Sequence, residues 1–68
     1  MNEDTMNMEI RKYLKQVGVT SQREIEHAVQ KALESGKING NESFDVKMTL
    51  EAPALGLVHH IDGHIALE

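Results

Sequence analysis

Apolar and polar side chains alternate along the last part of the chain, from Ser43 to Glu68. The alternation has a period of two on both sides of the segment Pro53-Ala54-Leu55-Gly56, which is typical of strands with one apolar face. The apolar positions are Phe44, Val46, Met48, Leu50 and Ala52 before that segment, and Leu57, Ile61, Ile65 and Leu67 after it. The pattern predicts an antiparallel hairpin that turns at residues 53–56 and buries residues such as Leu50 and Ile61.

The register of this hairpin follows from both faces. If the apolar positions share one face, Ala52 lies opposite Leu57. The polar face then pairs Lys47 with Asp62, Asp45 with His64, and Thr49 with His60. Opposite charges across a sheet are favourable, and a slip by one residue would turn the whole polar row inward. Both patterns therefore predict the same register.

Asp62-Gly63 is an alternative turn, since this dipeptide is common in hairpins. A turn there would make residues 65–67 a short third strand and leave Phe44 and Val46 without cross-strand partners. We therefore favour one long second strand, with Gly63 as a kink or bulge within it.

Before the hairpin, apolar residues recur at helical spacing in two groups. The first group is Met6, Ile10, Tyr13, Leu14 and Val17, and the second is Ile25, Ala28, Val29, Ala32 and Leu33. The first predicts a helix from about Asp4 to Gln16, capped by Asp4 or Thr5 and stopped by Gly18. The second predicts a helix that enters through the capping-box match of residues 21–24 and ends at Gly36.

The expected fold is therefore α+β, with two helices followed by a long antiparallel β-hairpin (ααββ) and both helices packed on one face of it. Residues 1–68 form a single small domain in this prediction. A chain of this size has a marginal core, so burial against a second copy would stabilise it. We expect a homodimer.

Composition and charge limit the compartment and the partners. The chain has no cysteine and a net charge of −4 with histidine neutral, and its longest apolar runs are far too short to span a bilayer. These features favour a cytoplasmic protein without membrane contact. A negative net charge gives no general attraction to phosphate, so nucleic acid is not an expected partner.

The most specific candidate chemistry lies in the second strand. His60, Asp62 and His64 stand at alternating positions, so all three point to one face and are candidate metal ligands. The two histidines are four residues apart, about 13 Å along an ideal strand. A solvated polar row with cross-strand partners is the favoured interpretation, and weak zinc or small-ligand binding is the alternative. His59 falls on the apolar face opposite Leu50, where we expect it to be partly buried.

No residues form a catalytic arrangement, so the chain is not expected to be an enzyme and no cofactor is implied. The acidic helix residues Glu24, Glu26 and Glu34 lie on the outward side, and no nucleophile has a base beside it. Residues 13–38 have the rhythm of a helix-turn-helix that continues into a winged hairpin. An acidic recognition face would repel phosphate, which leaves winged-helix nucleic-acid binding as a minor alternative.

Four blocks of the sequence resemble a known family. They are residues 1–5, residues 18–26, the Ser35-Gly36-Lys37 turn and the closing Ile65-Ala66-Leu67-Glu68. This set is similar to a family of short bacterial proteins catalogued only as a domain of unknown function. The resemblance covers nearly the whole chain and implies an independently occurring protein. It implies no activity, partner or catalytic residue.

The expected function is that of a small non-enzymatic interaction or accessory module in the cytosol, homodimeric and with an unidentified protein partner. The alternative is a weak metal- or small-ligand-binding protein that uses the strand histidines.

Overall fold

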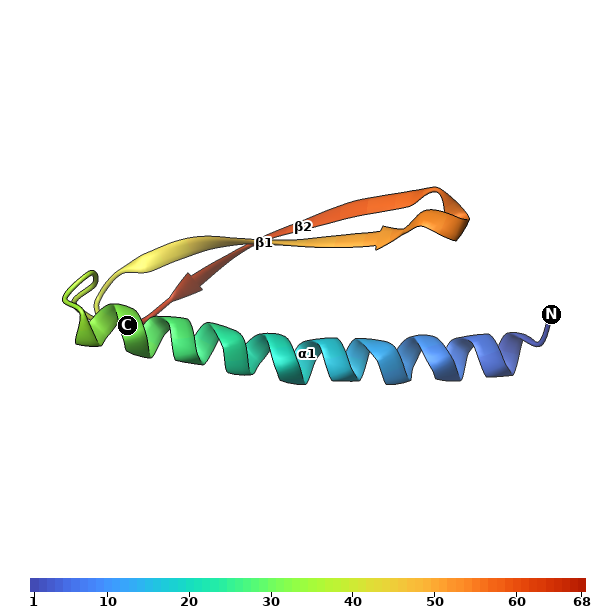
Figure 1. Cartoon of the computed structure of the whole chain (residues 1–68), viewed down its shortest axis with the longest axis horizontal. Coiled ribbons are helices and arrows are strands. Elements are labelled where there is room, and N and C mark those ends of the chain that lie inside the picture. The colour runs from blue at the N-terminus through green and yellow to red at the C-terminus, as the bar shows by residue number, and fades with distance from the viewer. The chain divides into compact units, whose positions relative to one another are not determined.

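The computed structural model describes residues 1–68 and contains one long helix followed by a two-stranded antiparallel hairpin (Figure 1). The helix α1 spans Glu3–Glu34, and the strands β1 and β2 span Ser43–Ala52 and Leu57–Ala66. A short 3-10 helix, η1, covers Pro53–Leu55 between the strands. The chain divides into two compact units, Met1–Lys37 and Ile38–Glu68, so that one unit holds the helix and the other holds the hairpin. The α+β class is as expected.

The prediction of two helices is wrong, because α1 runs without a break through Gly18. The residues with positive φ are Gly36, Gly40 and Gly56, so Gly18 does not adopt the left-handed conformation that would end a helix. The Thr20 hydroxyl donates to the carbonyl of Gln16 at 2.9 Å, which ties it to the preceding turn of the same helix. A glycine inside a helix costs only about 1 kcal/mol relative to alanine. That penalty is too small to interrupt a helix favoured on both sides.

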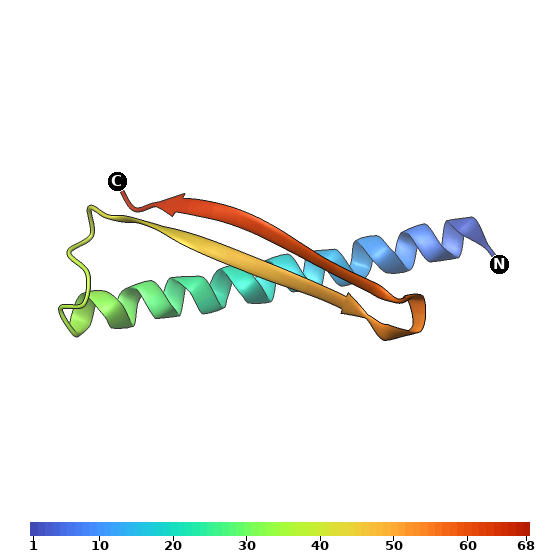
Figure 2. The ribbon, with the colours of Figure 1, turned by 90° about the horizontal axis from the view of Figure 1, so that it is seen from above.

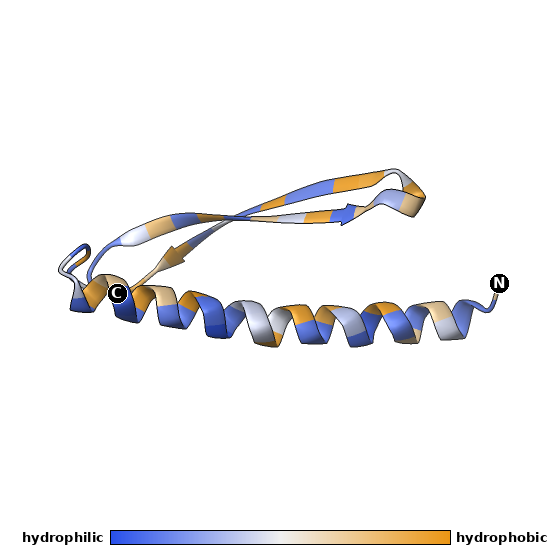
Figure 3. Cartoon of the chain, viewed as in Figure 1, coloured by the Kyte–Doolittle hydropathy of each residue, from blue (hydrophilic) through white to orange (hydrophobic).

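The two apolar groups are in phase, which explains the continuity. One line of positions repeats at spacings of four, three and four: Ile10, Leu14, Val17, Ser21, Ile25, Ala28 and Ala32. We call this line the apolar stripe of α1. Eleven residues in three turns is 3.67 residues per turn, close to the 3.6 of an α-helix, so the line stays on one face. Ser21, expected to cap a second helix, instead lies inside α1. Figure 3 shows apolar residues recurring along the helix.

Local signals define both ends of α1. The Asn2 side chain accepts a hydrogen bond from the backbone N–H of Thr5 at 3.1 Å and caps the first turn, so the cap is neither Asp4 nor Thr5. At the other end Gly36 has φ of 75°, as expected for a helix stop. There the backbone N–H of Lys37 donates to the carbonyl of Ala32 at 2.9 Å, and that of Gly36 to the carbonyl of Leu33 at 3.2 Å. This pair of bonds is a Schellman motif.

The hairpin register is confirmed. Ala52 lies opposite Leu57, and the pairing continues without interruption to Ser43 opposite Ala66. Gly56 closes the turn with φ of 63° and donates its backbone N–H to the carbonyl of Pro53 at 3.1 Å. The two strands twist around each other along their length (Figures 1 and 2), as antiparallel ribbons do.

Gly63 lies within β2 and pairs directly with Val46, so Asp62-Gly63 does not turn the chain and no third strand forms. The pairing is regular, without a bulge. A Cβ added at Gly63 would stand 3.1 Å from Cγ2 of Val46. A larger residue at this position would therefore require the Val46 side chain to shift.

No side chain of the chain is buried, which corrects the expected core. Leu50 is half-buried, but Ile61 on the same face of the hairpin is 54% exposed. His59, expected to be partly buried, is exposed. The alternation identified the apolar face correctly, yet that face remains accessible to solvent.

Two alanine substitutions separate a continuous helix from a broken one. Gly18 and Gly36 both have open space where a Cβ would stand, and they differ in φ. Gly18→Ala should raise the free energy of unfolding by about 0.5–1 kcal/mol, because alanine is the better helix former. Gly36→Ala should lower it by about 1–2 kcal/mol, because alanine is strained in the left-handed region. Urea denaturation followed by far-ultraviolet circular dichroism measures both, and destabilisation by Gly18→Ala would contradict the continuous helix.

Candidate functional site on the polar face of the hairpin

The candidate site is the row of polar side chains on the outer face of the hairpin, which we call the polar row. It consists of Asp45, Lys47 and Thr49 on β1 and His60, Asp62 and His64 on β2. The structure pairs Asp45 with His64, Lys47 with Asp62, and Thr49 with His60, as the sequence predicted. Period-two geometry alone brings these six residues to one face.

Two of the three pairs make direct contacts. Nδ1 of His64 lies 2.8 Å from Oδ1 of Asp45. Because a carboxylate only accepts, the His64 ring donates from Nδ1 in this contact. Nδ1 of His60 lies 3.1 Å from Oγ1 of Thr49. The His64 and Asp45 side chains are 59% and 93% exposed, so solvent screens this pair and its contribution to stability is small.

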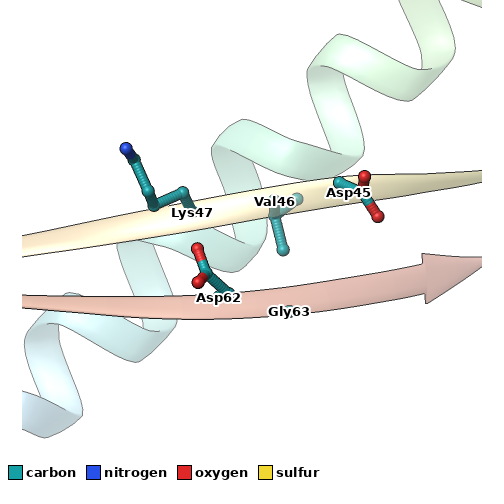
Figure 4. A pocket seen from close by; sticks show the side chains of 5 residues that line it. All are labelled: Asp45, Val46, Lys47, Asp62 and Gly63. Carbon is teal, nitrogen blue, oxygen red and sulfur yellow. The ribbon is translucent and has the colours of Figure 1, made fainter.

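The third pair is open. His64–Asp45 is the only contact between an acidic and a basic side chain at salt-bridge distance, so Lys47 and Asp62 lie opposite each other without forming an ion pair. Figure 4 shows the Lys47 ammonium group pointing away from β2, while the Asp62 carboxylate lies between the strands. Together with Asp45, Val46 and Gly63, these two residues line an open hollow. The Lys47 charge therefore remains available to a group outside this hairpin.

The structure contains no group of three or more histidine, aspartate or glutamate side chains arranged to hold a metal ion. Two of the three candidate ligands, His60 and His64, use Nδ1 for a cross-strand contact, and their Nε2 atoms make no hydrogen bond. Asp62 stands between them in β2. Zinc binding by these three residues stays a prediction.

A feature that sequence reasoning missed is the loop before β1, which is organised by the carboxylate of Glu42. The backbone N–H of Asn39 donates to both carboxylate oxygens, at 2.8 and 3.0 Å. The N–H groups of Gly40 and Asn41 donate to Oε1 at 2.8 and 3.1 Å. These bonds, that of Asn39 foremost, hold the pKa of Glu42 below its usual range. The available signal was a turn-prone Asn-Gly-Asn directly followed by an acidic residue.

The fold and the polar row define a small α+β protein built from one amphipathic helix and one hairpin. The model of a family of unknown function, DUF6494, matches residues 1–68, and the chain belongs to that family. No curated protein and no solved structure shows significant similarity to it. The structure also contains no helix that combines the length and the apolar character needed to cross a bilayer.

The metal prediction can be tested by titrating zinc while amide NMR shifts are recorded. If the site forms, the resonances of His60 and His64 should move together below millimolar zinc at neutral pH. The response should disappear under acidic conditions, because protonated imidazole does not bind metal. The double variant His60→Ala/His64→Ala is the control. Independent shifts, or no response below millimolar zinc, would contradict a shared site.

Because of Glu42, the free energy of unfolding of the hairpin unit should decrease at acidic pH. Its pKa is lower in the folded than in the unfolded chain, so its contribution is complete above the ordinary glutamate pKa and is lost as the pH falls through the folded value. In Glu42→Gln, which keeps one acceptor oxygen but no charge, that part of the pH dependence should be missing. Urea denaturation between neutral and strongly acidic pH measures the difference.

The matched control for this experiment is Glu26→Gln on α1. Glu26 makes no side-chain hydrogen bond or ion pair, so this variant should follow the pH profile of the unmodified chain. Parallel profiles for Glu42→Gln and the unmodified chain would show that the loop bonds do not form in solution.

Proposed function

We propose that the protein is a small, non-enzymatic interaction module that acts as a homodimer in the cytoplasm and presents a surface to a protein partner. The observation that supports this proposal is the accessible apolar surface of each unit. No residue is buried, although many large apolar side chains belong to regular, amphipathic elements. A cytoplasmic location suits a chain without cysteine.

The helix unit has an apolar face that it cannot cover by itself. Ile10 and Leu14 in the apolar stripe are 48% and 53% exposed, and Tyr13 beside them is 55% exposed. Most of the stability of a helix in a protein comes from packing of such a face, and an isolated helix in water is marginal. The apolar stripe of α1 is therefore a surface that would be stabilised by packing against a partner.

The hairpin unit likewise cannot cover its own apolar face, and it also leaves the edges of its strands unpaired. A two-stranded hairpin is at best marginally stable alone in water, because its apolar face and its edges remain in contact with solvent. Here Met48 is 41% exposed, Leu57 39% and Ile61 54%. Both strands are also edges, each with a row of backbone groups that no neighbouring strand pairs. Association with another chain would satisfy both needs.

A second copy is the simplest such chain, since it is present wherever the protein is and a two-fold arrangement closes on itself. Self-association also stabilises the folded state by mass action. Dimerisation on one surface leaves the remaining apolar residues for the further protein partner.

Sedimentation equilibrium at tens of micromolar should show a species of about 15 kDa, twice the 7.6 kDa of the chain. Its melting temperature should rise with protein concentration, because dissociation accompanies unfolding. A monomer throughout this range, with a melting temperature independent of concentration, would contradict the homodimer.

A further inference from the structure

We propose that two copies of this chain join through the free edge of β1, antiparallel to each other about a two-fold axis at Thr49. The two hairpins then form one four-stranded sheet in the order β2-β1-β1-β2. This inference rests on the homodimer proposed above and assigns its interface.

The backbone of β1 offers the bonding groups that such an edge needs. The N–H of Leu67 donates to the carbonyl of Glu42 at 3.0 Å, and these two residues lie directly opposite in the register. Bonded and non-bonded pairs alternate along an antiparallel ladder, so even-numbered β1 residues bond to β2. The odd-numbered residues direct their N–H and C=O groups outward. These are Ser43, Asp45, Lys47, Thr49 and Glu51.

The side chains of these residues select the register. Lys47 and Glu51 lie two positions on either side of Thr49 and on the same face, and neither makes an ion pair within the chain. A two-fold axis at Thr49 places Lys47 of each copy opposite Glu51 of the other, and Thr49 opposite Thr49. Opposite charges and threonine pairs are both favourable across antiparallel strands. The axis produces the charge pair twice.

The apolar face agrees with this register. The same axis places Met48 opposite Leu50 and Val46 opposite Ala52 of the other copy. Because the axis runs perpendicular to the sheet, the apolar faces of both hairpins lie on one side. A sheet of three or more strands with an apolar face can be stable where a single hairpin cannot.

Other axes on β1 are less favourable. An axis at Lys47 opposes two lysines, and one at Met48 places Asp45 opposite Glu51. An axis at Val46 pairs Lys47 with Asp45, whose carboxylate already contacts His64 at 2.8 Å. It also places apolar Leu50 opposite Glu42.

The edge of β2 offers a weaker charge pattern. Its polar row alternates histidine, aspartate and histidine. Because β2 contains no lysine or arginine, no axis on it pairs an ammonium or guanidinium group with a carboxylate.

Disulfide cross-linking tests the axis directly, because the chain contains no cysteine and single-cysteine variants report one position each. Thr49→Cys should form a covalent dimer under mild oxidation. Directly opposite residues of a bonded antiparallel pair have Cα atoms about 5.5 Å apart, within disulfide range. Val46→Cys is the matched control. With the axis at Thr49, its two copies lie about 20 Å apart and should not cross-link.

A charge exchange gives a second, independent test. Lys47→Glu or Glu51→Lys alone places like charges opposite each other twice and should weaken the dimer roughly tenfold in sedimentation equilibrium. The double variant Lys47→Glu/Glu51→Lys should return within about twofold of the original affinity. Lys12→Glu on α1 makes the same change in net charge as Lys47→Glu and should leave the affinity unchanged. Rescue in the double variant also shows that the single variants were not simply unfolded.

Each result has a separate meaning. Cross-linking at Thr49 together with rescue in the double variant supports the β1 interface. A dimer that cross-links at Val46 overturns the register, and one that shows neither cross-link nor rescue overturns the β1 edge while leaving the homodimer intact. A monomer at all concentrations overturns both proposals.

Discussion

The pairing of β1 with β2 in one register is the constraint on which the rest of the hairpin unit depends. The four-residue turn, with Gly56 in the left-handed region, places Ala52 opposite Leu57. Every later pair follows because side chains alternate with a period of two. A slip of one residue would turn the polar residues of β2 to the side of the apolar residues of β1, and it would separate Asp45 from His64 and Thr49 from His60. The polar contacts and the proposed intermolecular edge therefore share a single geometric origin.

The hairpin could be predicted from the sequence because its alternation and its cross-strand charge pairs indicate the same register. The single helix could not, because its local end signals and its apolar periodicity indicate different structures. Gly18 and the capping-box match at Ser21 both indicate a helix boundary when considered locally. The phase of the apolar stripe, from Ile10 to Ala32, indicates one surface. Continuity costs about 1 kcal/mol at a single glycine, while a break would have to nucleate a second helix and satisfy two new ends. The continuous helix therefore has the lower free energy. The small penalty at Gly18 should not have outweighed an apolar periodicity that keeps its phase from Ile10 to Ala32.

The candidate site shows the same division. Its membership and pairing follow from alternation, so the six residues of the polar row were predictable. The Glu42 loop was not, because four N–H to oxygen bonds from three successive residues depend on a loop conformation that no periodicity encodes. The burial of side chains could not be predicted from the sequence either. A pattern shows which side of an element is apolar, but the covering of that side depends on what else is present. Ile61 is 54% exposed on a face that the pattern describes as interior.

Exposed apolar faces and unpaired edges favour association with other chains. The residues of β1 determine which of these associations are favourable. Lysine on an edge strand normally discourages pairing with arbitrary strands, since it must leave solvent or meet another charge. In β1 the same lysine has a glutamate four residues further along the strand and a threonine midway between them. This spacing rejects most partners and most registers, yet it is complementary to itself under a two-fold rotation. Charges that would protect the edge of a monomer can therefore also specify its pairing with a second copy.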